Sequence, residues 1–273
     1  MASAPVVVLP RTDAVHPPPT AHRLAPTPGS PPTFPQLPSR PTFSAMLYPE
    51  LAGRTAAVRA RIAERQARSG WSHPVTIIAV TKTHPVDAVR EACAAGLTAV
   101  GENRVQEALS KQDAAAGVAV EWHLIGSLQK NKARQAVNRF TLIHSVDRLD
   151  LAAELDRRAA AETRQPILLQ VNCSAEPQKG GVEPADLSAL VDAVVSLERI
   201  ELRGLMTMAA FTEDEDRQRA AFRQLRELRE AEQRRGVRLP ELSMGMSGDY
   251  LVAVEEGATM VRLGTLLFGE RGL

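Results

Sequence analysis

The sequence predicts a single (β/α)₈ TIM barrel, an α/β fold in which eight parallel strands alternate with helices around a closed sheet. Two observations lead to this prediction: from residue 50 onward short apolar runs alternate with helical patterns, and there are eight such units. Alternating strands and helices are typical of a parallel sheet, and eight units over roughly 225 residues fit one barrel. A doubly wound sheet is the alternative, but no GxGxxG follows the first predicted strand.

The elements begin with an amphipathic helix over residues 49–70. Its apolar stripe contains Leu51, Val58 and Ile62, and Gly70 ends it. The strands are expected at residues 75–81, 97–100, 121–125, 141–145, 167–172, 202–206, 241–244 and 259–263.

Three of the later helices carry their own signals. Asp147 is expected to cap the helix of "RLDLAAELDRRAA". A second helix has Leu187, Leu190, Val191 and Val194 at the spacing of one helical face. A third covers residues 213–236, begins acidic, ends basic and stops at a glycine, as the helix dipole favours.

Residues 1–44 differ from the rest of the chain, because they hold twelve of its 19 prolines. Such a segment sustains neither a helix nor a central strand, and we expect a disordered tail. The predicted domain division is therefore a tail over residues 1–44 and a barrel over residues 47–273. Met46 stands where the barrel begins, which suggests the hypothesis that translation starts there instead of at Met1.

Composition argues for an ordinary globular protein. Hydrophobic residues make up 44% of the chain and charged residues 24%, and the formal net charge is +1. This balance does not predict a nucleic-acid or membrane-surface partner, and no apolar run has the length of a membrane span. The two cysteines, Cys93 and Cys173, form no metal or disulfide pattern. We expect a cytoplasmic protein.

A barrel places its chemistry at the carboxyl ends of the strands, and Lys82 follows the first one. The simplest interpretation is that Lys82 marks where the strand meets water. However, the chain has 33 basic residues, of which only five are lysines. In a chain that prefers arginine, a lysine at a strand end is a candidate for chemistry that needs an amine, such as Schiff-base formation.

The last two strands end in small polar residues. Ser247 precedes a helix, and Gly264 and Thr265 follow the eighth strand. Ordinary turns use the same residues, but the loops after strands seven and eight are the usual phosphate site of barrels. Arg262 lies within the apolar segment "ATMVRLGTLLF", so its charge needs an acceptor from the protein or from a ligand.

A primary amine, a phosphate cradle and an arginine at one barrel mouth together match pyridoxal 5′-phosphate (PLP). Its aldehyde suits Lys82, its phosphate suits the turns at Ser247 and Gly264, and its ring nitrogen suits Arg262. Arginine keeps that nitrogen unprotonated, so the ring would be a poor electron sink. His123 and His144 are read as strand-end residues with hydrogen-bond partners rather than as ligands, and Lys179 lies in a glycine-rich loop that could cover the site.

Seven motifs occur in order: "IIAVTKTHP", "GENRVQE", "WHLIGSLQKNK", "IHSVDR", "LLQVNCS", "LRGLMTM" and "LSMGMSGDYLVAVEEGATMVRLGTLLFGER". Over about residues 47–271 the chain resembles the pyridoxal phosphate homeostasis proteins, also called YggS/PROSC-like proteins. The resemblance implies a barrel like the N-terminal domain of alanine racemase. It implies that Lys82 holds PLP as a covalent Schiff base, that Arg262 faces the pyridine nitrogen, and that Asn103 lies beside the cofactor. It also assigns the phosphate to Ser247, Gly264 and Thr265.

The family has no well-established catalytic activity and is implicated in PLP homeostasis, with PLP-requiring apoenzymes as candidate recipients. The chain departs from the family pattern at Ser127, where proline is common, and at His84, where lysine is frequent. Neither change removes an expected cofactor contact, but a histidine at position 84 could alter PLP transfer that uses nearby lysines.

A weak amino-acid racemase is the alternative function. Two-base racemization needs a second acid/base group, which alanine racemases take from a separate β-domain. Only eleven residues follow Arg262, so we expect no such domain, and Tyr250 is the marginal candidate for that group. A Schiff-base aldolase that uses Lys82 without PLP is a third possibility. The expected state is a monomer with no nucleic-acid or membrane partner.

Overall fold

The computed structural model describes residues 46–174, 176 and 179–270. The predicted Pro-rich tail over residues 1–44 lies outside the described residues, so its disorder and the division from the barrel stay predictions.

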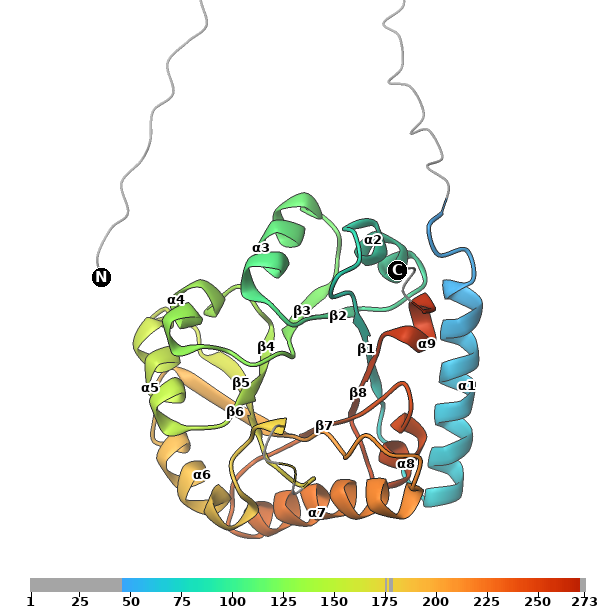
Figure 1. Ribbon diagram of the computed structural model, residues 1–273. Coiled ribbons are helices and arrows are strands. Elements are labelled where there is room, and N and C mark those ends of the chain that lie inside the picture. Colours follow the sequence, from blue (N-terminus) through green and yellow to red (C-terminus); the bar gives the residue numbers. More distant parts are fainter. Residues whose placement is uncertain (1–45, 175, 177–178, 271–273) are drawn as a thin grey trace, which may run out of the picture. The chain divides into compact units, whose positions relative to one another are not determined.

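The described chain forms a closed barrel of eight parallel strands in sequence order, with β1 paired to β8 (Figure 1). The strands are β1 (Thr76–Val80), β2 (Ala99–Glu102), β3 (Glu121–Leu124), β4 (Leu142–Val146), β5 (Gln165–Gln170), β6 (Ile200–Met206), β7 (Glu241–Met246) and β8 (Met260–Leu263). The predicted fold class is confirmed. All eight strands overlap the predicted runs, and the largest shifts are at β2 and β5; at β2, Leu97 is buried ahead of the strand instead of within it.

Helices surround the barrel, as Figure 1 shows. They are α1 (Leu51–Ser69), α2 (Asp87–Ala94), α3 (Val105–Ala114), α4 (Ala133–Ala136), α5 (Leu149–Arg158), α6 (Leu187–Val195), α7 (Glu215–Arg234), α8 (Tyr250–Glu255) and α9 (Thr265–Phe268), with short 3₁₀ turns η1 (Lys130–Lys132) and η3 (Pro184–Asp186). No helix among the described residues is long and apolar enough to cross a membrane.

Local signals placed most of these helices correctly. The stripe of α1 is buried, and Gly70 ends the helix in the left-handed region at φ 76°. The four apolar residues predicted for one face of α6 are all buried. The cap predicted at Asp147 is wrong: α5 begins after Arg148 without a side-chain cap, because the Asp147 carboxylate accepts a hydrogen bond from the Arg148 guanidinium instead.

The barrel interior explains why a charged residue fits an apolar strand. Side chains alternate between the lumen and the helical layer along each strand. In β8, Val261 and Leu263 join the core between sheet and helices, whereas Met260 belongs to the small cluster inside the barrel. Arg262 shares the inward phase of Met260 and therefore lies in the barrel axis at the carboxyl end of the strands.

Candidate functional site

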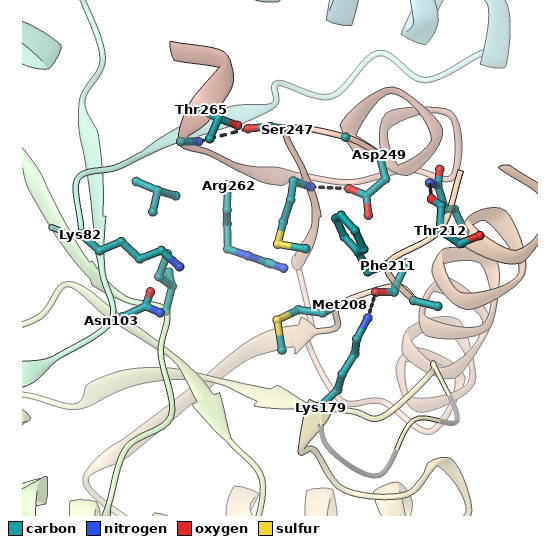
Figure 2. A pocket seen from close by; sticks show the side chains of 18 of the residues that line it. Lys82, Asn103, Lys179, Met208, Phe211, Thr212, Ser247, Asp249, Arg262 and Thr265 are labelled. Atoms are coloured by element: carbon teal, nitrogen blue, oxygen red, sulfur yellow. Dashed lines mark hydrogen bonds between the residues drawn. The ribbon is translucent and has the colours of Figure 1, made fainter. Parts of the chain in front are cut away.

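A cavity of about 1010 Å³ opens at the carboxyl ends of the strands. All six residues that the sequence singled out line it, although they come from four separate strand ends: Lys82, Asn103, Ser247, Arg262, Gly264 and Thr265. Figure 2 shows Lys82, Asn103 and Arg262 pointing into the same space, with Ser247 and Thr265 along another edge.

Lys82 lies immediately after β1, half-buried, in a turn that is fixed on both sides. On one side, the carbonyl of Thr81 accepts a hydrogen bond from Lys111 Nζ at 2.7 Å. On the other side, Thr83 has a left-handed φ of 65°, and its N–H donates to Glu107 Oε1 at 2.6 Å. A non-glycine residue in this region is strained, so the surrounding contacts must hold the turn in place.

Those contacts form a buried ion cluster. Lys111 also donates to Glu102 Oε1 and Glu107 Oε1, both at 2.8 Å, and Thr81 Oγ1 donates to Glu102 Oε1 at 2.6 Å. Burial raises the pKa of Glu102 despite the hydrogen bonds from Lys111 and Thr81. Burial also acts to raise the pKa of Glu107, but the hydrogen bonds from Lys111 and from the Thr83 N–H outweigh it and lower that pKa.

Arg262 finds the acceptors that its burial requires. Its side chain donates to the carbonyl oxygen of Ser243 at 2.9 Å, to Ser243 Oγ at 2.6 Å and to the carbonyl oxygen of Thr207 at 2.9 Å. Burial lowers the pKa of Arg262 to about 10, against the favourable charge of Asp249. The guanidinium is therefore charged at neutral pH, and the three acceptors named above are neutral oxygens rather than a carboxylate.

Ser247 organises another wall of the cavity. Its hydroxyl oxygen accepts hydrogen bonds from the backbone N–H groups of Gly264 and Leu266, each at 3.3 Å. Both amides therefore face the hydroxyl at the carboxyl end of the barrel, next to Thr265. Amide and hydroxyl donors at such a strand end are suited to a phosphate group.

The cavity thus offers three kinds of donor that match PLP: an amine for the aldehyde, a charged guanidinium for an unprotonated ring nitrogen, and amides with hydroxyls for the phosphate. Asn103 lines the space beside Lys82 (Figure 2). Gly126 packs against it so closely that an added Cβ would lie 2.4 Å from the Asn103 carbonyl oxygen.

Sequence reasoning missed the far wall of the cavity. This wall contains the segment after β6, including Met208, the fully exposed Phe211 and the buried Gln218. Lys179 joins it, donating to the Ala209 carbonyl and pairing with a nearby glutamate (Figure 2). Only the motif "LRGLMTM" and the glycine-rich loop of Lys179 pointed to this region, because apolar residues in a loop carry no chemical signal of their own.

The tyrosine considered for a second acid/base group lies elsewhere. Tyr250 belongs to α8, is buried, and packs its ring under the guanidinium of Arg61, 5.9 Å from the ring centroid. No tyrosine is among the described residues that line the cavity.

Residues 54–272 match the family model described as alanine racemase, N-terminal domain. Among curated proteins, the chain is 45% identical over 221 residues to the pyridoxal phosphate homeostasis protein of Aquifex aeolicus (strain VF5), covering 80% of this chain and 97% of the relative. The protein of that name from Escherichia coli (strain K12) is 40% identical over 227 residues, covering 81% and 97%.

Solved structures agree with this relationship. PipY of Synechococcus elongatus PCC7942 with PLP bound has a TM-score of 0.71 and 42% identity, covering 80% of this chain and 100% of PipY. Alanine racemase from Clostridium difficile 630 has a TM-score of 0.62 at 15% identity, covering 79% of this chain and 57% of the enzyme, and this likeness shows the fold alone.

Proposed function

Because the chain belongs to the pyridoxal phosphate homeostasis proteins, within the alanine racemase N-terminal domain family, we propose that it binds PLP for intracellular PLP homeostasis. The observation that supports this best is the shared cavity of Lys82, Arg262 and the amides around Ser247. A carrier of this kind keeps a reactive aldehyde sequestered and passes it on without robust catalysis of its own.

Lys82 is the residue we propose for the covalent Schiff base. When bound, PLP supplies an aldehyde that a primary amine captures and a ring that can delocalise electrons. The half-buried Lys82 reaches into the cavity from a turn whose two flanking peptides are held by Lys111 and Glu107. A turn held in this way presents the amine in one position and so lowers the entropy that must be lost on binding.

The remaining contacts follow from the donors of each wall. Ser247, Gly264 and Thr265 bind the phosphate, and Asn103 lies beside the cofactor. Arg262 donates to the ring nitrogen, and because an arginine that stays charged cannot also accept, no proton is held on that nitrogen. A ring without that proton stabilises a carbanion poorly, which favours holding PLP over amino-acid chemistry.

Racemization is not favoured, because the described part of the cavity wall offers no tyrosine as a second acid/base group. The proposal also includes a cytoplasmic, monomeric protein that supplies PLP-requiring apoenzymes. A formal net charge of +1 supports neither a nucleic-acid nor a membrane-surface partner.

The absorption spectrum of the purified protein tests the proposal, recorded after incubation with PLP and removal of the unbound cofactor, before and after borohydride reduction. Wild type should show a yellow band that reduction removes, with the reduced cofactor fixed to Lys82 in peptide mass spectra. Lys82→Ala should lack the band, whereas the control Lys130→Ala, which removes an exposed lysine that pairs with Asp150, should keep it. A wild-type protein that stays colourless after this treatment would refute the function.

A further inference from the structure

A chain of buried hydrogen bonds crosses the lumen of the barrel below the cavity. Arg262 Nη1 donates to Ser243 Oγ at 2.6 Å, Ser243 Oγ lies 2.9 Å from His144 Nδ1, and His144 Nε2 lies 2.8 Å from His123 Nδ1. The four side chains come from β8, β7, β4 and β3, and each is at most 4% exposed. Because β7 and β4 are not neighbours in the barrel, the Ser243–His144 bond spans its interior.

The direction of every hydrogen bond in this series of side chains can be worked out from Arg262, because a guanidinium can only donate. Ser243 Oγ therefore accepts from Arg262, and the buried hydroxyl proton needs an acceptor, which His144 Nδ1 supplies. His144 is then neutral and carries its proton on Nε2, which donates to His123 Nδ1. His123 in turn carries its proton on Nε2, so all donors point away from the cavity.

The electrostatics agree with a neutral His144. Burial, with the charge of Arg262 as a further cause, holds the pKa of His144 well below its ordinary value. At the far end, His123 Nε2 makes no hydrogen bond among the described residues and lies 3.6 Å from Glu121 Oε2. Glu121 is exposed at the start of β3, at the opposite end of the barrel from the cavity, and its contact with His123 lowers its pKa, with Arg203 adding a smaller favourable charge.

Two buried imidazoles in the barrel axis cost more free energy than apolar side chains of the same volume would in the same space. A cluster of apolar side chains also lies inside the barrel. Among the described residues, the side-chain hydrogen bonds of the two histidines stay within this series of four side chains, and at the cavity end the series stops at Arg262. This points to a role at the arginine rather than in general packing.

We propose that His144 is a positioning residue for Arg262, acting through Ser243. By taking the Ser243 proton, His144 leaves the lone pairs of Ser243 facing Arg262 and so fixes the orientation of the guanidinium toward the cavity. The inference rests on the proposed function, because the group that the oriented guanidinium meets is the ring nitrogen of PLP. Without His144 the serine hydroxyl can rotate, and the guanidinium loses a fixed acceptor.

Three variants test this role. His144→Phe keeps a ring but removes both hydrogen bonds. His144→Gln keeps an acceptor for Ser243 and a donor for His123. Ser145→Ala is the matched control, because it removes a nearly buried strand hydroxyl that donates to Gly126 and does not contact Arg262.

The readouts are the PLP dissociation constant and the visible spectrum of the bound cofactor, with the thermal unfolding of the cofactor-free protein as a check of folding. His144→Phe should bind PLP about tenfold more weakly, the loss expected for one charge-assisted hydrogen bond, and should shift the spectrum. His144→Gln should stay within about twofold of wild type, as should Ser145→Ala.

A folded His144→Phe protein with the wild-type affinity and spectrum would overturn the inference, as would a His144→Gln protein as impaired as His144→Phe. If His144→Phe does not fold, Ser243→Ala replaces it, with the same expected shift and loss of affinity, and a wild-type result there would overturn the inference too. A wild-type protein that does not bind PLP would instead refute the proposed function, so the two failures are distinguishable.

Discussion

Replacing Lys111 by methionine measures how far the turn that carries Lys82 depends on one buried ion cluster. The substitution removes three hydrogen bonds, to the Thr81 carbonyl, Glu102 and Glu107. Glu102 is fully buried, and one of its carboxylate oxygens already lacks a hydrogen-bond partner among the described residues. Its only remaining side-chain partner would be the Thr81 hydroxyl.

The magnitude follows from this loss of charge compensation. Removing one partner of a buried ion pair destabilises a protein by about 3–5 kcal/mol, because the other charge stays buried and unpaired. We expect Lys111→Met to lower the free energy of unfolding by that amount. Glu107 contributes less of it, because a quarter or more of its side chain is exposed to solvent.

Urea unfolding of the cofactor-free protein is the assay, with the double variant Lys111→Met/Glu102→Gln as its control. A neutral glutamine does not need the ammonium, so the double variant should recover about 1–3 kcal/mol of the loss. A single variant that loses less than about 1 kcal/mol would refute the reasoning, and so would a double variant no more stable than the single one.

Three further predictions concern separate positions. Gly126→Ala would place a Cβ 2.4 Å from the backbone oxygen of Asn103. Urea unfolding should therefore show a loss of about 1–3 kcal/mol of stability, and PLP binding should weaken. Gly53→Ala, where nothing lies within 4 Å of the added Cβ, is the control, and equal effects of the two substitutions would contradict the prediction. The lowered pKa of His144 means that its contribution to stability is complete above the unfolded pKa of about 6.5 and is lost as the pH falls toward the folded value. Between about pH 6.5 and the folded pKa, urea unfolding should show wild type losing up to about 1.4 kcal/mol more per pH unit than His144→Gln, and parallel curves would rule this out. Burial raises the pKa of Cys173 to about 12, so iodoacetamide should label it about tenfold more slowly than the other cysteine in native protein. Peptide mass spectrometry checks this against denatured protein, and similar native rates would count against it.

The sequence predicted the fold, and the six residues that it singled out line one cavity, because both results depend on local patterns combined with one topological rule. Apolar runs alternating with helices indicate a parallel barrel, and the carboxyl ends of its strands must then lie together. Arg262 was recognisable because a charge in an apolar run needs an acceptor. The identity of those acceptors, two backbone carbonyls and a serine hydroxyl, was not predictable, because it depends on the inward phase of three different strands.

The polar networks around the site escaped sequence analysis for the same physical reason. Lys111 reads as an ordinary helical lysine, and only the packing of α3 on the turn after β1 buries it against Thr81. His123 and His144 are 21 residues apart, and nothing in the local sequence of either histidine indicates that the two side chains meet. Their meeting with Ser243 requires the closed barrel and its strand stagger, which no local pattern contains.

The same two networks suggest a reason why this barrel, which alanine racemase shares, would bind PLP without catalysing a reaction on an amino acid. One network fixes the turn of Lys82 by its two flanking peptides, and the other orients Arg262 by a chain of donors that points away from the cavity. In the proposed function, both networks act on attachment of the cofactor. Neither brings a second proton-transfer group to the described cavity wall, and the arginine proposed to face the ring nitrogen would leave no proton there. An arrangement of this kind stabilises the bound aldehyde far more than it stabilises a carbanion, and that difference separates a carrier from a racemase.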